Sequence, residues 1–169
     1  SMNYKYCGLT FSSDLEFPFF RETYESTVFS VKLGCQSSIY KNKPAVFMDE
    51  ASFIVNFGPE GFYRITKDHI ICNFYDAELI KATLGNIPFA IVAILNGFLP
   101  IHCSSVMRHD SSAVLFLGNK GQGKTTLAFY LNKYMGYDLL GDDVITLSVV
   151  DGKNIVFPGV TKIKLWKKR

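Results

Sequence analysis

Residues 118 to 125 have the types and the spacing of a phosphate-binding loop, G-x-x-x-x-G-K-[ST], whose fixed positions are Gly118, Gly123, Lys124 and Thr125. Glycines allow backbone N–H groups to approach phosphate oxygens without a Cβ in the way. The lysine ammonium can reach the β- and γ-phosphates, and the threonine hydroxyl is a ligand for Mg²⁺. The pattern therefore predicts binding of a nucleoside triphosphate together with Mg²⁺ and leaves the choice between ATP and GTP open.

The flanking sequence supports this interpretation over an incidental glycine-rich turn. Residues 113–117 form a short apolar run that suits a buried strand, and residues 126–135 suit a helix, whose positive dipole end would face the phosphates. The residues expected to contact the phosphates are Gly118, Asn119, Lys120, Gly121, Gln122, Gly123, Lys124, Thr125 and Thr126.

An acidic pair, Asp142 and Asp143, follows the next apolar segment. Gly136 should end the helix, so that residues 137–141 return as a strand parallel to residues 113–117 through a right-handed crossover. The acidic pair would then emerge at the same sheet edge as the loop, where ligands of α/β sheets bind. One carboxylate can serve Mg²⁺ and the other can accept a proton from an attacking hydroxyl. The alternative is an aspartate pair in an ordinary turn.

His102 is a third candidate because of the hairpin expected around residues 108–112. This polar turn joins two apolar runs, 100–107 and 113–117, which should pair antiparallel. If Met107 faces Ala113, His102 falls opposite Gly118, beside the loop. The alternative is an ordinary core or edge histidine.

The elements that position these residues divide into two regions. The chain of 169 residues is rich in aromatic residues, with fifteen Phe and nine Tyr, which favours strands. We expect a β-rich region over residues 3–75 that contributes to substrate recognition, with strands at 4–11, 26–33, 45–48, 52–57, 61–66 and 69–74. The second region, residues 76–169, should begin with helices at 77–84 and 89–96, the first capped by Asp76, and should then carry the nucleotide-binding core. Further hairpin strands are expected at 144–150 and 154–157.

Composition narrows the class of protein. The net charge of +3 does not argue for nucleic acid, and the basic residues at the end of the chain suit a solvated tail: Lys162, Lys164, Lys167, Lys168 and Arg169. Residues 87–100 are apolar but too short to span a bilayer, and no signal peptide is recognisable. The four cysteines form no C-x-x-C pair, which favours reduced thiols. We therefore expect a cytoplasmic protein that contacts neither nucleic acid nor membrane.

Three segments resemble a known family: residues 101–106 (IHCSSV), residues 117–127 around the loop, and residues 136–143 (GYDLLGDD). Together they resemble the core of HPr kinase/phosphorylase, a fold type shared with ATP-dependent phosphoenolpyruvate carboxykinase. The Pro-Gly…Leu-Trp run at 158–166 resembles the same family. Residues 6–13 (YCGLTFSS) resemble the start of the HPr-kinase-like enzymes of lasso-peptide clusters, which phosphorylate a serine on a precursor peptide.

The resemblance implies an α/β fold with a mixed sheet and an ATP-dependent serine kinase activity on a peptide or protein, with ATP and Mg²⁺ as cofactors. It implies a catalytic cluster of His102, Asp142 and Asp143 beside Lys124, with Asp143 as the base, and a metal site at Asp142 and Thr125. Family members continue well beyond the Leu-Trp segment, so the core is expected to be incomplete at its C-terminal end. A non-catalytic nucleotide-binding module or sensor and a small-molecule kinase remain as alternatives, and a homo-oligomer is compatible with either.

Overall fold

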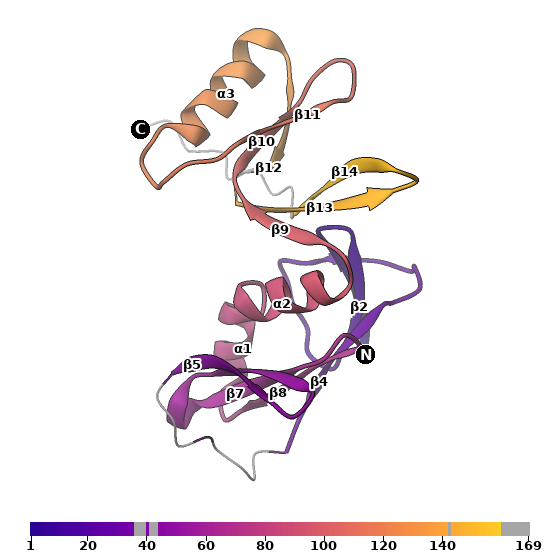
Figure 1. Cartoon of the computed structure of the whole chain (residues 1–169), viewed down its shortest axis with the longest axis vertical. Coiled ribbons are helices and arrows are strands. Elements are labelled where there is room, and N and C mark those ends of the chain that lie inside the picture. Colours follow the sequence, from indigo (N-terminus) through magenta and orange to yellow (C-terminus); the bar gives the residue numbers. More distant parts are fainter. Residues whose placement is uncertain (36–39, 41–43, 142, 160–169) are drawn as a thin grey trace. The chain divides into compact units, whose positions relative to one another are not determined.

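The structure, a computed structural model, describes residues 1–35, residue 40, residues 44–141 and residues 143–159 (Figure 1). It is an α/β protein with a mixed sheet and N-terminal strands. The chain forms two compact units: the first comprises Ser1–Lys5 and Leu9–Leu99, and the second comprises Tyr6–Gly8 and the chain from Pro100 onward. Asp142, the basic residues at the end of the chain and most of the Pro-Gly…Leu-Trp run lie outside the described residues.

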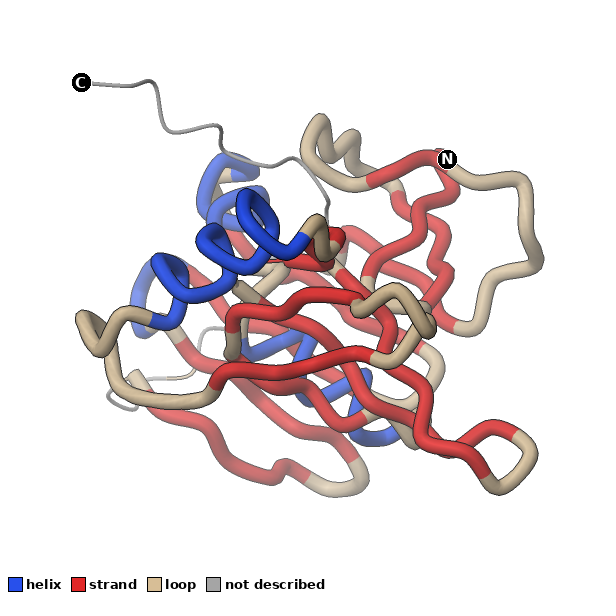
Figure 2. The backbone as a smooth tube through the Cα atoms, turned by 90° about the horizontal axis from the view of Figure 1, so that it is seen from above, coloured by secondary structure: helices blue, strands red, loops and turns tan. Residues whose placement is uncertain are grey.

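In the described part of the chain, the first unit is built on an eight-stranded mixed sheet with the order β3-β1-β2-β4-β8-β7-β6-β5. Strands make up most of the regular structure of the described chain (Figure 2). β2, β4 and β8 are parallel to one another, and β5 to β8 form an antiparallel meander. The strands are β1 (Met2–Tyr6), β2 (Leu9–Ser13), β3 (Arg21–Glu22), β4 (Phe29–Leu33), β5 (Ala45–Asp49), β6 (Ser52–Asn56), β7 (Gly61–Ile65) and β8 (His69–Phe74).

The last four of these strands confirm the expected ranges to within one residue, whereas the first expected strand is divided. Cys7 and Gly8 have φ of 48° and 79°, the left-handed conformation that a two-residue turn requires. The expected strand at 4–11 is therefore two neighbouring strands, β1 and β2, joined by this turn.

Two helices, α1 (Ala77–Thr83) and α2 (Ile87–Leu95), pack on β6, β7 and β8 of the same sheet, and a short 3₁₀ helix, η1 (Gly58–Glu60), precedes β7. The expected cap is confirmed, because the Asp76 carboxylate accepts a hydrogen bond from the Glu78 N–H at 2.9 Å. The Tyr63 hydroxyl on β7 donates a hydrogen bond to the Ile80 carbonyl at 3.3 Å, which links α1 to the sheet. Within the described residues, no single helix has both the length and the apolar composition needed to cross a bilayer; α1 and α2 reach it only as a pair bent by 61°.

The division between the units follows Leu99 rather than residue 75. The boundary expected at Asp76 is only a change of secondary structure, from strands to helices. Because α1 and α2 cover the sheet of the first unit, they belong to that unit.

The second unit contains α3 (Lys124–Met135) and, among the described residues, two three-stranded sheets with the orders β11-β10-β12 and β14-β13-β9. α3 packs against β10 and β12 (Figure 1). The strands are β9 (Leu99–His102), β10 (Ser104–Met107), β11 (Ala113–Phe116), β12 (Asp138–Gly141), β13 (Val144–Val150) and β14 (Lys153–Pro158).

Local turn chemistry explains the two hairpins of this unit. β10 and β11 are antiparallel with Met107 opposite Ala113, which confirms the expected register. β13 and β14 are joined by Asp151 and Gly152, whose φ values of 51° and 74° are those of a tight hairpin turn. Gly136 ends α3 as expected, with φ of 68°.

The crossover through α3 returns the chain in the expected direction, with β12 parallel to β11. β10 is antiparallel to both β11 and β12, so those two strands are parallel to each other. β10 lies between them, and their carboxyl ends flank its first residues.

The expected position of His102 opposite Gly118 is wrong. The ladder between β10 and β11 ends at the Ser104–Phe116 pair, and Cys103 separates β10 from β9. β9, which contains His102, belongs to the other sheet, beside β13. The apolar run at 100–107 is therefore two short strands that belong to different sheets.

Candidate nucleotide-binding site

The candidate loop connects the end of β11 at Phe116 to the start of α3 at Lys124. Gly121 and Gly123 have φ of 85° and 84°, which side chains with a Cβ adopt only with strain. At both positions an added Cβ would meet nothing within 4 Å, so conformation rather than space requires glycine. The sequence pattern explains loop glycines by the close approach of phosphate, whereas in this structure it is the positive φ of Gly121 and Gly123 that requires glycine.

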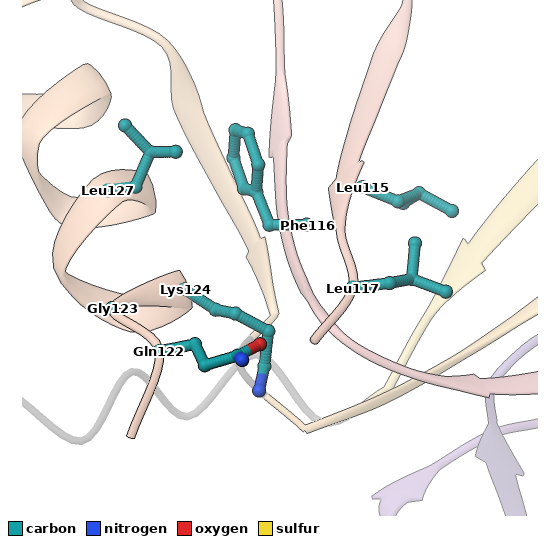
Figure 3. A pocket seen from close by; sticks show the side chains of 7 residues that line it. All are labelled: Leu115, Phe116, Leu117, Gln122, Gly123, Lys124 and Leu127. Carbon is teal, nitrogen blue, oxygen red and sulfur yellow. The ribbon is translucent and has the colours of Figure 1, made fainter. Parts of the chain in front are cut away.

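Lys124 lies across this loop. Its ammonium donates hydrogen bonds to the carbonyls of Gly118 at 2.5 Å and Asn119 at 2.9 Å. The cation is therefore held at the loop rather than extended into solvent, and it points to the side where Gln122 also ends (Figure 3). A bound anion would find this charge already in place.

The first turn of α3 adds donors to the same place. Gly123 is the N-cap and has no side-chain cap, so the leading N–H groups of the helix are not covered by a capping side chain of that residue. Thr125 and Thr126 lie in this turn and are exposed. A helix N-terminus together with a lysine ammonium is well suited to phosphate groups.

A pocket of about 310 Å³ adjoins the loop, at the lower end of the size range for ligand sites. Its lining is about equally polar and apolar and comes from β11, the loop and the first turn of α3 (Figure 3). The lining residues are Leu115, Phe116, Leu117, Gln122, Gly123, Lys124 and Leu127.

The structure brings His102 and Asp143 together. His102 Nδ1 lies 3.1 Å from Asp143 Oδ1, and their side chains are 70% and 79% exposed. The Cys103 N–H also donates to the Asp143 carbonyl at 2.9 Å, so the main chain holds the two segments in register. The expected proximity of His102 to the acidic pair is thus confirmed for Asp143, although by a route other than the hairpin register.

The loop and Asp143 follow strands that end at one edge of a sheet. Phe116, the last residue of β11, pairs with Ser104, and Gly141, the last residue of β12, pairs with Ser105. Two strand spacings separate these ends, or about 10 Å. This is the edge at which the crossover was expected to place the loop and the acidic pair.

Sequence reasoning missed the turn between β1 and β2. The Cys7 thiol donates to the Val144 carbonyl at 3.5 Å, and the Thr146 hydroxyl donates to the Cys7 carbonyl at 2.6 Å. Burial is the main cause of a raised pKa of the Tyr6 phenol, and the nearby Cys7 and Asp143 side chains raise this pKa further. No signal in the sequence indicated these contacts, because residues 4–11 by themselves indicate no more than a strand.

The described residues suit a triphosphate. The loop supplies backbone donors and a cation, and Thr125 supplies a hydroxyl oxygen, the kind of ligand that Mg²⁺ prefers. Among the described residues, no three His, Cys, Asp or Glu side chains are grouped so that they could hold a metal ion by themselves. Asp142, the expected metal ligand, lies outside the described residues.

No protein-family model matches the chain, and no solved structure matches it significantly. The loop and its surroundings are therefore the basis for assigning a function.

Proposed function

We propose that this protein binds ATP and Mg²⁺ at residues 118–126 and transfers the γ-phosphoryl group to a serine hydroxyl of a peptide or protein. The observation that carries the proposal is the loop between β11 and α3. It has glycines at positive φ, the Lys124 ammonium held against its carbonyls, and a helix N-terminus directly after it. This combination has the chemistry of a triphosphate site.

The donor half of the site comprises the loop and the first turn of α3. Lys124 would exchange its two carbonyl partners for phosphate oxygens, which are stronger acceptors because they are charged. Thr125 and Asp142 are the proposed ligands of Mg²⁺. When bound, this ion neutralises charge on the β- and γ-phosphates.

The acceptor half comprises Asp143 and His102. An exposed carboxylate can accept the proton of a serine hydroxyl as that oxygen attacks. His102 contacts the same carboxylate at 3.1 Å and would fix its orientation. These roles are the ones implied by the resemblance to HPr kinase, whose Asp pair and histidine occupy matching places in the sequence.

One observation favours a non-catalytic nucleotide-binding module as the second candidate. Asp143 and His102 are 79% and 70% exposed. Catalytic groups gain electrostatic strength when water is excluded, and this pair lies in water in the described chain. A sensor that only binds nucleotide does not require these two side chains to be shielded from water.

The test is incubation of the protein with γ-labelled ATP, Mg²⁺ and a co-expressed serine-containing peptide, followed by mass spectrometry of the peptide. We expect a phosphoserine product, and we expect Lys124→Ala to lose both ATP binding and transfer. Lys133→Ala is the matched control, because it removes a lysine from the last turn of the same helix. ATP binding without a phosphorylated acceptor would favour the binding module, and no ATP binding at all would refute both.

A further inference from the structure

The Gln122 side chain folds back across the candidate phosphate loop. Its Oε1 accepts a hydrogen bond from the Asn119 N–H at 2.9 Å, and the Gln122 backbone N–H donates to the Asn119 carbonyl at 3.3 Å. Residues 119 and 122 are therefore joined by both the main chain and a side chain. The Asn119 N–H is one of the loop amides, and it is already engaged.

The carboxamide also fills the space above Gly118. A Cβ at Gly118 would lie only 2.6 Å from Gln122 Oε1, well inside van der Waals contact. Lys124 donates to the carbonyls of Gly118 and Asn119, so the carboxamide and the ammonium end over the same two residues. Figure 3 shows the ends of both side chains converging at this point.

A phosphate oxygen bound by such a loop needs inward N–H groups and the lysine ammonium. The Gln122 oxygen has the hydrogen-bonding character of a phosphate oxygen, because it is an acceptor, but it carries no full charge. A charged oxygen makes stronger hydrogen bonds and can displace it.

We propose that Gln122 is an internal competitor for the phosphate site, which holds the free loop closed and lowers its affinity for triphosphates. Gln122 must leave the Asn119 N–H before a phosphate oxygen can take its place. It thereby determines affinity without being a catalytic residue. This inference rests on the proposed function, that the loop binds a triphosphate.

A scaffolding role for Gln122 predicts the opposite change in affinity. If the Gln122 hydrogen bond shaped the loop for phosphate, its removal would loosen the loop and weaken binding. The sign of the change in Kd therefore separates a competitor from a scaffold.

The experiment compares the wild-type protein with Gln122→Ala and Gln122→Met by titration calorimetry, using ATP with Mg²⁺ and, separately, inorganic tripolyphosphate. Gln122→Met keeps the length of the side chain and lacks the acceptor, so it tests the hydrogen bond even where alanine alters the loop. Because the loss of one neutral hydrogen bond is involved, we expect Kd to fall about three- to tenfold for both variants. The fall should be equal for both ligands, since they share only the phosphates.

Asn154→Ala is the control, because it removes an exposed carboxamide at the turn end of the β13–β14 hairpin and should leave Kd unchanged. An unchanged or higher Kd in both Gln122 variants, with binding by the wild type, overturns this inference and leaves the proposed function intact. Binding by the variants alone supports it. Binding by none of the proteins overturns the phosphate-loop assignment and this inference with it.

Discussion

The contact between His102 and Asp143 offers a way to separate a catalytic role from a structural one. The perturbation is Asp143→Asn, which keeps the shape of the side chain and removes its charge. His102→Ala and the double variant complete a double-mutant cycle. The three variants together measure how far the two side chains act as a unit.

The structure sets a small value for the effect on stability. The upper limit is the attraction between a protonated imidazole and the carboxylate, about 1 kcal/mol at the observed 3.1 Å in a water-like dielectric. The side chains are 70% and 79% exposed, so this attraction is screened and partly offset by lost side-chain freedom. We therefore expect each single variant to change the free energy of unfolding by less than about 1 kcal/mol.

The expected effect on phosphoryl transfer is much larger. A positioned general base contributes about 10²- to 10⁴-fold to a rate, which corresponds to about 3 to 5 kcal/mol of barrier. Asp143→Asn should therefore lose most of the transfer and retain ATP binding. His102→Ala should lose less, because it acts through the orientation of Asp143.

Three measurements check these values: urea unfolding for stability, calorimetry for ATP affinity, and single-turnover transfer from γ-labelled ATP to the serine peptide. Undiminished transfer by Asp143→Asn would refute its role as the base. A loss of several kcal/mol in the free energy of unfolding would instead assign the pair a structural role.

Two further predictions concern the thiols and the end of α3. Burial raises the pKa of the Cys7 thiol from 9.0 to about 12, so the stability that its protonated form contributes is complete below pH 9 and is lost as pH rises to 12. The urea midpoint of unfolding should fall across this pH range, and it should fall less steeply in Cys7→Ala. Iodoacetamide at pH 8 should label the exposed Cys35 but not Cys7, and labelling of Cys7 in the folded protein would contradict this. His109 Nε2 lies 2.9 Å from the Met135 carbonyl at the end of α3. His109→Ala should therefore lower the free energy of unfolding by about 1 kcal/mol. An unchanged urea midpoint would show that the contact contributes nothing.

Sequence reasoning predicted the parts of the fold that depend on local chemistry. The polar turn between β10 and β11 implied the pairing of Met107 with Ala113, and the Asp151-Gly152 pair implied the last hairpin. The Gly118–Thr125 pattern implied a loop between a strand and a helix, and the structure has this loop between β11 and α3. In each case, neighbouring residues along the chain determine the backbone conformation.

Other features did not follow from local patterns. The division of residues 100–107 into β9 and β10 was missed, because an apolar run looks the same whether it enters one sheet or two. The boundary between the units was expected near residue 76, because the switch to helices hid the fact that α1 and α2 cover the first sheet.

By itself, the sequence determined that this protein has a loop suited to phosphate, with a lysine and a helix placed to complement negative charge. Residue types and short spacings suffice for that, because the loop is a continuous segment. Only the tertiary structure decided how His102 reaches Asp143, that Cys7 contacts Val144, and that Gln122 covers the Asn119 amide. The first two contacts join residues that are distant along the chain, so packing determines them. The third depends on the conformation of an exposed side chain, which a residue pattern does not specify.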